Sequence, residues 1–223
     1  MKNSYYRNES PLSGGRFLTR GWKVEPKLKT NGKYEQIMAA AIRVFAEQGY
    51  FQSTIAQIAR AAGVADGTIY LYFKNKEDIM AQFVNQQSQK FFDTFTSMFS
   101  EEQSALERLK ALIKLHFQVS QEDRYMALVY QVEMRRSDRL MKEDIKDALR
   151  MYHDLVGQIV EEGQQDGTIR HDVQIGLVKR MIFATVDEVI TSWVMAGGKY
   201  DLVPLAEPLA DLLMQGIQAT PTV

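Results

Sequence analysis

The sequence predicts an all-α protein, and three observations support this fold class. From Lys33 onward, apolar residues recur at three- and four-residue intervals, which is the period of amphipathic helices. Short polar breaks rich in Asp, Ser and Gly separate the periodic segments. No segment of useful length shows the alternation of apolar and polar residues that is typical of a β-strand.

The N-terminal segment differs from the rest of the chain. Residues 1–32 combine Ser, Asn, Gly and Pro with scattered basic residues and show no helical period, so we interpret them as a flexible arm or leader. A first helix is expected from Lys33 to just before Gly49, a residue type common after a helix end. Its apolar face carries Tyr34, Ile37, Met38, Ala41 and Phe45.

Two short helices and a longer one are expected next. Thr54 and Gln57 form a capping-box pattern at the start of a helix of about two turns, which Gly63 ends. A third helix starts at Asp66. Asn75 is a suitable N-cap for the fourth helix. The inward residues of that helix are expected to be Ile79, Phe83, Phe91, Phe95 and Met98.

The remaining sequence predicts five more amphipathic helices. They are expected near residues 105–120, 124–135, 139–165, 173–196 and 204–218. We therefore divide the chain into the arm (1–32), a three-helix helix-turn-helix domain (33–79) and a larger C-terminal helical domain (80–223).

The composition excludes several classes of protein. The chain has 223 residues, 45% of them hydrophobic, which suffices for a buried core. No apolar stretch approaches the roughly 18 residues of a transmembrane helix, and no secretory signal is visible, so we expect a cytoplasmic protein without a membrane partner. The absence of cysteine excludes disulfides, thiolate nucleophiles and cysteine-ligated metals.

The helix expected over 173–196 is apolar on nearly all sides. Such a helix must be covered on more than one face, which favours a core on one face and a second copy of the chain on the other. We therefore expect a homodimer with two-fold symmetry; the alternative is a central helix buried within one subunit. The residues expected at the dimer interface are Val186, Ile190, Trp193, Leu209 and Leu213.

Two short helices joined by a Gly-containing turn fit a helix-turn-helix, although a purely structural hairpin would show the same period. The residues narrow this choice. Between Ile37 and Phe83 the sequence contains Ala-Ala-Ile-Arg-Val-Phe-Ala-Glu-Gln-Gly-Tyr, then Gly-Thr-Ile-Tyr-Leu-Tyr-Phe and Lys-Asn-Lys-Glu. This run closely resembles the DNA-binding domain of the TetR family of bacterial transcriptional regulators.

The resemblance implies which residues meet double-stranded DNA. Four would contact backbone phosphates and hold the register: Thr54, Tyr70, Tyr72 and Lys76. Four others would face base edges in the major groove: Asp66, Gly67, Thr68 and Leu71. From the residues alone, Gly67 allows close backbone approach, and Asp66 either accepts a hydrogen bond from a cytosine amine or caps its helix. Ile69 and Phe73 are expected in the core.

A second, narrower resemblance covers the C-terminal part. Residues 131–137, 181–188 and 193–203 resemble the FadR-type regulators of fatty-acid degradation in Gram-positive bacteria. Members of that group release their operators when a long-chain acyl-CoA binds, so the resemblance implies a repressor with this effector and no other cofactor. The alternatives are a multidrug-sensing repressor of an efflux gene and a helical lipid-binding protein without DNA function.

A lining for an acyl chain can also be proposed from the residues themselves. Apolar, flexible side chains lie on helices that should converge: Met126, Val129, Met134, Met151, Leu155, Met181 and Phe183. Plain core packing is the simpler interpretation of each one taken singly. Arg135, Arg136 and Arg139 cluster between two helices, where they could bind CoA phosphates or form an ordinary solvated helix end.

Asp187 and Glu188 lie within the most apolar helix and need partners if buried. His116, His153 or Thr185 could supply hydrogen bonds, and His116 is also assigned to the ligand lining. No metal site is expected, because no His-Glu-x-x-His spacing occurs. No catalytic residue is expected either, because the sequence lacks a Gly-x-Ser-x-Gly elbow, a Gly-rich phosphate loop and an arrangement of histidines suited to a triad.

Ligand binding is expected to shift the helix that begins at Asn75, because this helix connects the two domains. The two recognition helices of the dimer would then no longer fit major grooves one DNA turn, about 34–36 Å, or a small multiple of it apart. This mechanism requires tighter ligand binding to the DNA-incompetent arrangement, with a coupling free energy of about 1–3 kcal/mol or more.

The formal net charge of −1 hides an uneven distribution of charge. Residues 1–32 carry seven basic and two acidic residues, whereas residues 33–79 carry five of each. A neutral DNA-binding domain offers little general attraction to phosphates, so we hypothesise that the arm supplies it.

Deleting residues 1–32 is expected to flatten the salt dependence of DNA binding, because fewer counterions would be released from the duplex. The slope of log affinity against log salt concentration, measured for the full and the shortened chain, checks this. An unchanged slope would show that the arm takes no part in binding.

Overall fold

The computed structural model of the chain describes residues 32–98, 103–133 and 142–218. Within these ranges every regular element is a helix, apart from one isolated antiparallel bridge between Ile169 and Gln218, so the predicted all-α class is confirmed. None of the helices in the described ranges has the length and apolar character needed to cross a membrane.

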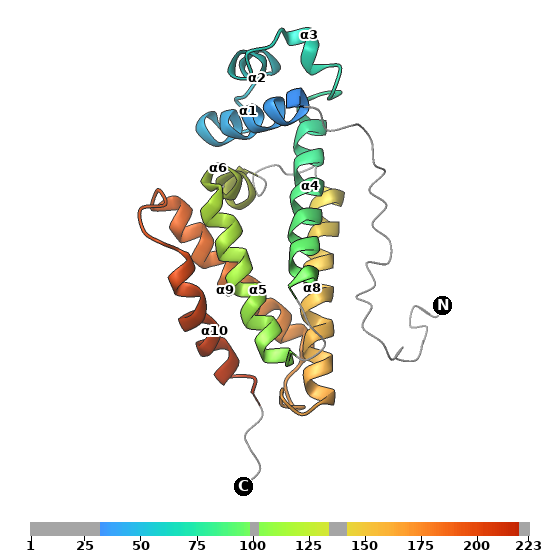
Figure 1. Cartoon of the computed structure of the whole chain (residues 1–223), viewed down its shortest axis with the longest axis vertical. Coiled ribbons are helices and arrows are strands. Elements are labelled where there is room, and N and C mark those ends of the chain that lie inside the picture. Colours follow the sequence, from blue (N-terminus) through green and yellow to red (C-terminus); the bar gives the residue numbers. More distant parts are fainter. Residues whose placement is uncertain (1–31, 99–102, 134–141, 219–223) are drawn as a thin grey trace, which may run out of the picture.

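Three helices form a unit at one end of the molecule, here called the headpiece (Figure 1): α1 (Gly32–Gln48), α2 (Ile55–Ala61) and α3 (Asp66–Ile69). The capping box predicted for α2 is present, because Gln57 N donates to Thr54 Oγ1 at 3.3 Å and Thr54 N donates to Gln57 Oε1 at 2.8 Å. Gly49 and Gly63 have φ angles of 86° and 63° at the ends of α1 and α2, as their residue type predicted.

Helix α3 is shorter than the sequence pattern suggested. It ends at Ile69, and the residues from Tyr70 to Tyr72 form turns. Its N-cap is Ala65, so the interpretation of Asp66 as a capping residue is wrong. Asp66 instead occupies the first helical position, where a carboxylate is favoured by the helix dipole.

The other helices form the body, into which α4 runs from the headpiece (Figure 1). Its elements are α4 (Lys76–Ser97), α5 (Ala105–Glu122), α6 (Arg124–Leu128), the π-helix η1 (Val129–Glu133), α8 (Lys142–Gln165), α9 (Ile175–Met195), the 3-10 helix η2 (Val203–Leu205) and α10 (Ala206–Gln215). Asn75 caps α4 as predicted, accepting from Asp78 N at 2.7 Å. The helix predicted over 124–135 is divided into α6 and η1, and its end lies outside the described residues.

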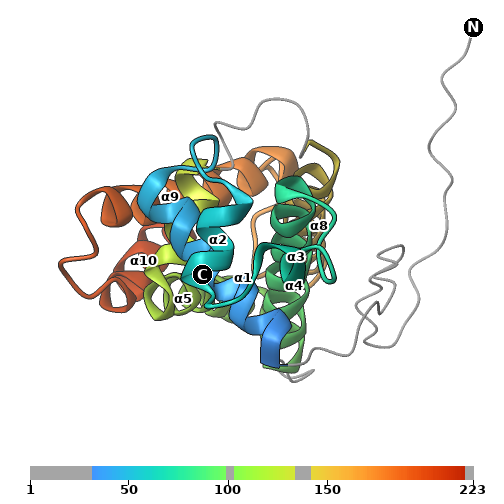
Figure 2. The ribbon, with the colours of Figure 1, turned by 90° about the horizontal axis from the view of Figure 1, so that it is seen from above.

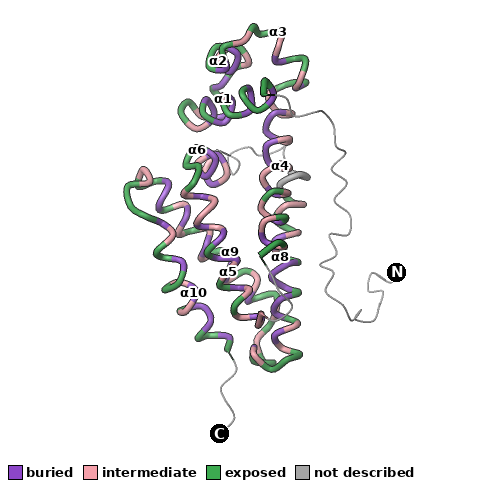
Figure 3. Tube along the Cα trace, in the orientation of Figure 1, coloured by how far each residue is buried: buried purple, intermediate pink, exposed green. Residues whose placement is uncertain are grey.

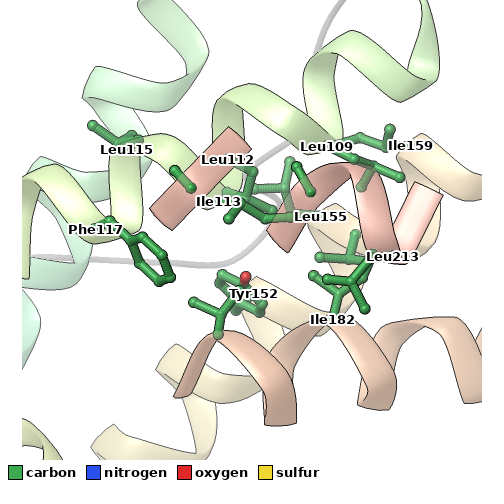
Figure 4. Close-up of a cluster of buried hydrophobic side chains, with 14 of the residues drawn as sticks. Leu109, Leu112, Ile113, Leu115, Phe117, Tyr152, Leu155, Ile159, Ile182 and Leu213 are labelled. Carbon is green, nitrogen blue, oxygen red and sulfur yellow. The ribbon is translucent and has the colours of Figure 1, made fainter. Parts of the chain in front are cut away.

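Each helix of the body turns a buried face inward and an exposed face outward (Figure 3). The body core lies between α5, α8, α9 and α10 (Figure 4). It includes Leu109, Leu112, Ile113, Phe117, Tyr152, Ile159, Ile182 and Leu213. Complete burial of one such aliphatic or aromatic side chain stabilises a fold by about 1.5–3 kcal/mol.

The headpiece has its own core, in which Ile69 and Phe73 are buried as predicted. Residues of the body complete this core: Ile79, Met80, Phe83 and Val84 of α4, Met126 of α6 and Val129 of η1. Helix α6 lies beneath α1 in Figure 1, and seen from above the headpiece covers the end of the body (Figure 2). The Arg43 guanidinium of α1 also stacks 5.4 Å from the ring centroid of Tyr125 in α6. Headpiece and body are therefore joined by α6 and η1 as well as by α4.

Most of the inward residues predicted for α4 are confirmed. Ile79, Phe83 and Phe95 are buried, and Phe91 is half-buried. The prediction for Met98 is wrong, because this residue is the C-cap of α4 and its side chain is 42% exposed.

Two glycines within α8 provide a test of the packing. A Cβ at Gly163 would lie 2.7 Å from both Ala105 Cβ and Ile169 Cδ1, whereas a Cβ at Gly157 would meet only the mobile end of the Lys179 side chain. Gly163→Ala is expected to lower the free energy of unfolding by about 1 kcal/mol or more, because overpacking outweighs the gain in helix propensity. Gly157→Ala is expected to be neutral or stabilising by up to about 1 kcal/mol. Urea unfolding measures both; equal effects would contradict the close packing at Gly163.

Candidate functional site

The outer face of the headpiece carries the residues that the sequence assigned to DNA. Thr54, Asp66, Gly67, Tyr70 and Leu71 are exposed, and Thr68 and Tyr72 are half-buried. Leu71 is 75% exposed, so it has little packing role within this chain. A Cβ at Gly67 would meet no protein atom within 4 Å, so the space beside this residue is open to a partner. Most of these residues are therefore accessible to a partner, while their contacts with DNA stay a prediction.

Lys76 has a structural role that the sequence did not reveal. Its Nζ donates to the carbonyl oxygens of Tyr50 at 2.8 Å, Ser53 at 3.1 Å and Phe51 at 3.4 Å. The ammonium also lies 4.5 Å from the centroid of the Tyr50 ring. All three of its donors are therefore directed at the α1–α2 loop, and Lys76 fixes the start of α4 to the loop that precedes Thr54.

A cavity of about 400 Å³ lies within the body, between α4, α5, α6, η1, α8 and α9. Its size is in the range of small-molecule sites, and its walls are largely apolar and aromatic. The lining consists of Gln87, Ser88, Phe91, Phe92, His116, Val119, Ser120, Met126, Ala127, Tyr130, Gln131, Ala148, Leu149, Tyr152, Phe183 and Asp187.

Three of the predicted ligand residues line this cavity: His116, Met126 and Phe183. Four others do not line it and instead pack in or against the two cores: Val129, Met151, Leu155 and Met181. For these four, the simpler interpretation as core residues holds. Met134 and the cluster of Arg135, Arg136 and Arg139 lie outside the described residues.

Sequence reasoning missed most of the cavity wall. Tyr152 is a buried polar aromatic that lines it, Tyr130 lines it with a half-buried ring, and Ser88 and Gln131 add polar atoms. No local motif marks these residues, because they come from three separate helices, α4, η1 and α8. Nor does α8 offer a recurring aromatic pattern, because Tyr152 is its one Phe, Tyr or Trp.

The cavity wall contains one carboxylate, that of Asp187, and its other titratable groups are uncharged at neutral pH. Burial lowers the pKa of His116 to about 4, so its imidazole is uncharged at neutral pH. Burial also raises the pKa of Tyr130, to about 12, and that of Tyr152, where the Asp187 carboxylate adds to the effect. Among the described lining residues there is no Lys or Arg.

The two carboxylates of α9 do not behave as the sequence suggested. Glu188 is exposed and accepts from Ser192 Oγ at 3.1 Å, whereas Asp187 is half-buried at the cavity wall. Thr185 Oγ1 donates to the Met181 carbonyl at 2.7 Å, so the expected bond from Thr185 to a carboxylate is absent. The described residues contain no group of three or more His, Cys, Asp or Glu that could hold a metal ion.

The residues predicted at a dimer interface face the interior of the protomer. Val186, Ile190 and Trp193 are at most 3% exposed, and Leu213 is buried in the same core. Leu209 is half-buried against that core. These side chains offer little surface to a second chain, so their apolar pattern reflects packing within one subunit. Other apolar residues on α9, η2 and α10 are exposed instead: Leu177, Met195, Leu205 and Leu212.

Comparisons with known proteins place this architecture in a family. The description "Bacterial regulatory proteins, tetR family" matches residues 37–83, and "YsiA-like protein, C-terminal region" matches residues 80–216. The chain belongs to the TetR family of bacterial regulatory proteins. This TetR-family protein is 42% identical to the fatty acid metabolism regulator protein of Bacillus subtilis, over 83% of this chain and 95% of that protein.

Solved structures agree with this result. The fatty acid degradation regulator FadR from Bacillus halodurans is similar with a TM-score of 0.80 and 40% identity, over 86% of this chain and 100% of that one. FadR from Bacillus subtilis, solved in complex with stearoyl-CoA, is similar with a TM-score of 0.77 and 42% identity, over 83% and 100% of the two chains. The resemblance of this TetR-family protein to FadR-type regulators is confirmed.

The two lysines of the Lys-Asn-Lys motif provide a matched test of the role of Lys76. Lys76→Met is expected to lower the free energy of unfolding by about 1–2 kcal/mol, because three carbonyl oxygens lose a charged donor. Lys74→Met, at an exposed position, is expected to change it by less than about 0.5 kcal/mol. Urea unfolding measures both variants. If Lys76→Met left stability unchanged and weakened only DNA binding, Lys76 would be a phosphate contact without the structural role.

Proposed function

We propose that this TetR-family protein is a homodimeric, cytoplasmic repressor that binds palindromic operator DNA and releases it when a long-chain acyl-CoA enters the cavity. The observation that carries this proposal is the double role of Met126, which lines the cavity and also belongs to the headpiece core. The genes controlled are those of fatty-acid degradation, by similarity to the regulators at 40–42% identity.

The cavity suits an acyl chain. Its wall is formed by Phe91, Phe92, Val119, Met126 and other apolar side chains, and thioether and aromatic groups adapt to a flexible alkyl ligand. The charged part of CoA would remain near the surface, where Arg135, Arg136 and Arg139 are our candidates for phosphate contacts. The complex of Bacillus subtilis FadR with stearoyl-CoA supports this ligand class.

Contacts around Tyr130 supply a route from the cavity to the headpiece. This residue lines the cavity, and its hydroxyl donates to the Val84 carbonyl of α4 at 3.1 Å and lies 3.2 Å from Ser88 Oγ. Its ring centroid is 5.4 Å from that of Phe83. A ligand that displaces Tyr130 therefore acts on α4, whose first residues hold the headpiece through Lys76. This route agrees with the predicted shift of the helix after Asn75.

A second copy of the chain would cover the exposed apolar residues of α9, η2 and α10. Leu177, Met195 and Leu212 are each more than 60% exposed. Two-fold pairing through this surface would place two headpieces on the same side of the dimer. The two α3 helices would then meet major grooves about 34–36 Å, or a small multiple of it, apart.

One feature of the cavity favours the alternative of a multidrug sensor. The Asp187 carboxylate lies in an aromatic lining, which is an arrangement that suits an aromatic cation. Operator release by different ligands decides between the two effectors.

Gel-shift assays with DNA from fatty-acid degradation promoters test the proposed function. We expect salt-sensitive binding that stearoyl-CoA abolishes and that a cationic aromatic dye leaves unchanged. Release by the dye alone would support the multidrug alternative. Absence of salt-sensitive binding to any fragment would contradict the role as a DNA-binding regulator and favour a lipid-binding protein.

Tyr130→Phe is expected to make the regulator more sensitive to its ligand. We propose that the hydrogen bond from Tyr130 to Val84 stabilises the DNA-competent arrangement, so its loss, worth about 1 kcal/mol, would lower the stearoyl-CoA concentration for half-release about fivefold. Tyr125→Phe, which alters a partly exposed hydroxyl on α6, serves as the control and should leave that concentration unchanged. Equal titration curves for wild type and Tyr130→Phe would contradict this coupling route.

A further inference from the structure

Two polar side chains meet at the cavity wall without a hydrogen-bonding partner. His116 of α5 and Tyr152 of α8 have ring centroids 5.6 Å apart, and both line the cavity. His116 Nδ1 and the Tyr152 hydroxyl oxygen are buried, and neither has a partner among the described residues. Burying a polar group without a partner is unfavourable, so such a pair is informative when it faces a ligand-sized space.

The surroundings of the pair are aromatic. The Phe91 ring lies 5.1 Å from that of His116, and the Phe183 ring lies 5.6 Å from that of Tyr152, measured between centroids. Both groups are uncharged at neutral pH, because burial lowers the pKa of His116 to about 4 and raises that of Tyr152. The cavity therefore presents neutral hydrogen-bonding groups at this point.

The pair lies close to a side on which the cavity reaches the surface. Leu149 lines the cavity and is also 37% exposed, so it marks a side on which the cavity reaches the surface. Tyr152 follows Leu149 by three residues, which is one turn of α8. Met126 and Tyr130, on α6 and η1, line another part of the same cavity, beside the headpiece. A ligand in this cavity can therefore contact both the pair and the wall beside the headpiece.

We propose that His116 and Tyr152 form a binding site for the carbonyl oxygen of the acyl thioester, with the alkyl chain extending toward Met126 and Tyr130. This assignment rests on the proposed function and specifies the contact that orients the ligand. The Tyr152 hydroxyl, and the imidazole in the tautomer that places its proton toward the ligand, donate to the oxygen.

The same site disfavours a free fatty acid. A carboxylate would lose its hydration in a lining that holds the Asp187 carboxylate and, among the described residues, no Lys or Arg. A thioester carbonyl is uncharged, so it requires only the neutral donors that the pair supplies. The site therefore recognises the activated acyl group and rejects the carboxylate form of the same chain.

Calorimetric titration of the full chain with stearoyl-CoA and with its thioether analogue, S-octadecyl-CoA, tests the proposal, because the analogue differs by the carbonyl oxygen alone. Wild-type protein should bind the thioester about tenfold more tightly than the thioether. Tyr152→Phe should reduce this ratio to about two or less, and Tyr125→Phe, the control, should keep it. His116→Leu should also reduce the ratio, whereas His116→Gln, which keeps a donor, should restore part of it.

Three outcomes would overturn the assignment. One is a thioester-to-thioether ratio that is the same in wild type and Tyr152→Phe. Another is a wild-type ratio near one. A third is a preference for 3-hydroxystearoyl-CoA over stearoyl-CoA that wild-type protein shows and Tyr152→Phe lacks. This result would mean that the pair binds a hydroxyl oxygen on the alkyl chain and not the thioester carbonyl. If neither CoA ligand bound at all, the proposed function itself would fail. Thermal unfolding of each variant distinguishes loss of the contact with the ligand from loss of the folded structure.

Discussion

The segment formed by α6 and η1 is packed on both sides, and the relation between the two halves of the molecule depends on this packing. On one side, Met126 and Val129 complete the headpiece core. On the other side, Met126, Ala127 and Tyr130 form part of the cavity wall. Protein interiors have little free volume, so a displacement of such a segment is passed to its neighbours. The π-helical geometry of η1 is rare and often occurs at functional sites, which fits a segment that responds to a ligand.

Under the proposed function, this packing would allow a modest free energy to control DNA binding. Residues 33–79 carry five basic and five acidic residues, so under the proposed function the affinity for DNA would depend on the placement of Thr54, Tyr70 and Leu71 more than on general charge. Placement in turn depends on α4, because Lys76 holds the loop before Thr54. A ligand shifts the equilibrium only by its difference in affinity for the two arrangements, and each tenfold difference corresponds to about 1.4 kcal/mol.

Local features of the structure could be predicted from the sequence, and features that depend on distant contacts could not. The caps at Thr54 and Asn75 and the left-handed turns at Gly49 and Gly63 involve neighbouring residues, so their patterns were sufficient. The cavity wall combines residues from helices far apart in the chain, so Tyr130, Tyr152 and Asp187 carried no recognisable signal as a group. The apolar period of α9 could not reveal whether its own chain or a second copy covers it, and Val186, Ile190 and Trp193 proved to be internal. The partners of Lys76 lie 23–26 residues earlier in the chain, beyond the reach of a local motif.

A crystal structure of the regulator with stearoyl-CoA tests the coupling between cavity and headpiece most directly. The alkyl chain should contact Met126 and Tyr130, and the bond from the Tyr130 hydroxyl to the Val84 carbonyl, 3.1 Å in the structure described above, should be broken, with α4 and the headpiece displaced. An occupied cavity in which this hydrogen bond and the packing of α6 and η1 against α1 are unchanged would contradict the account.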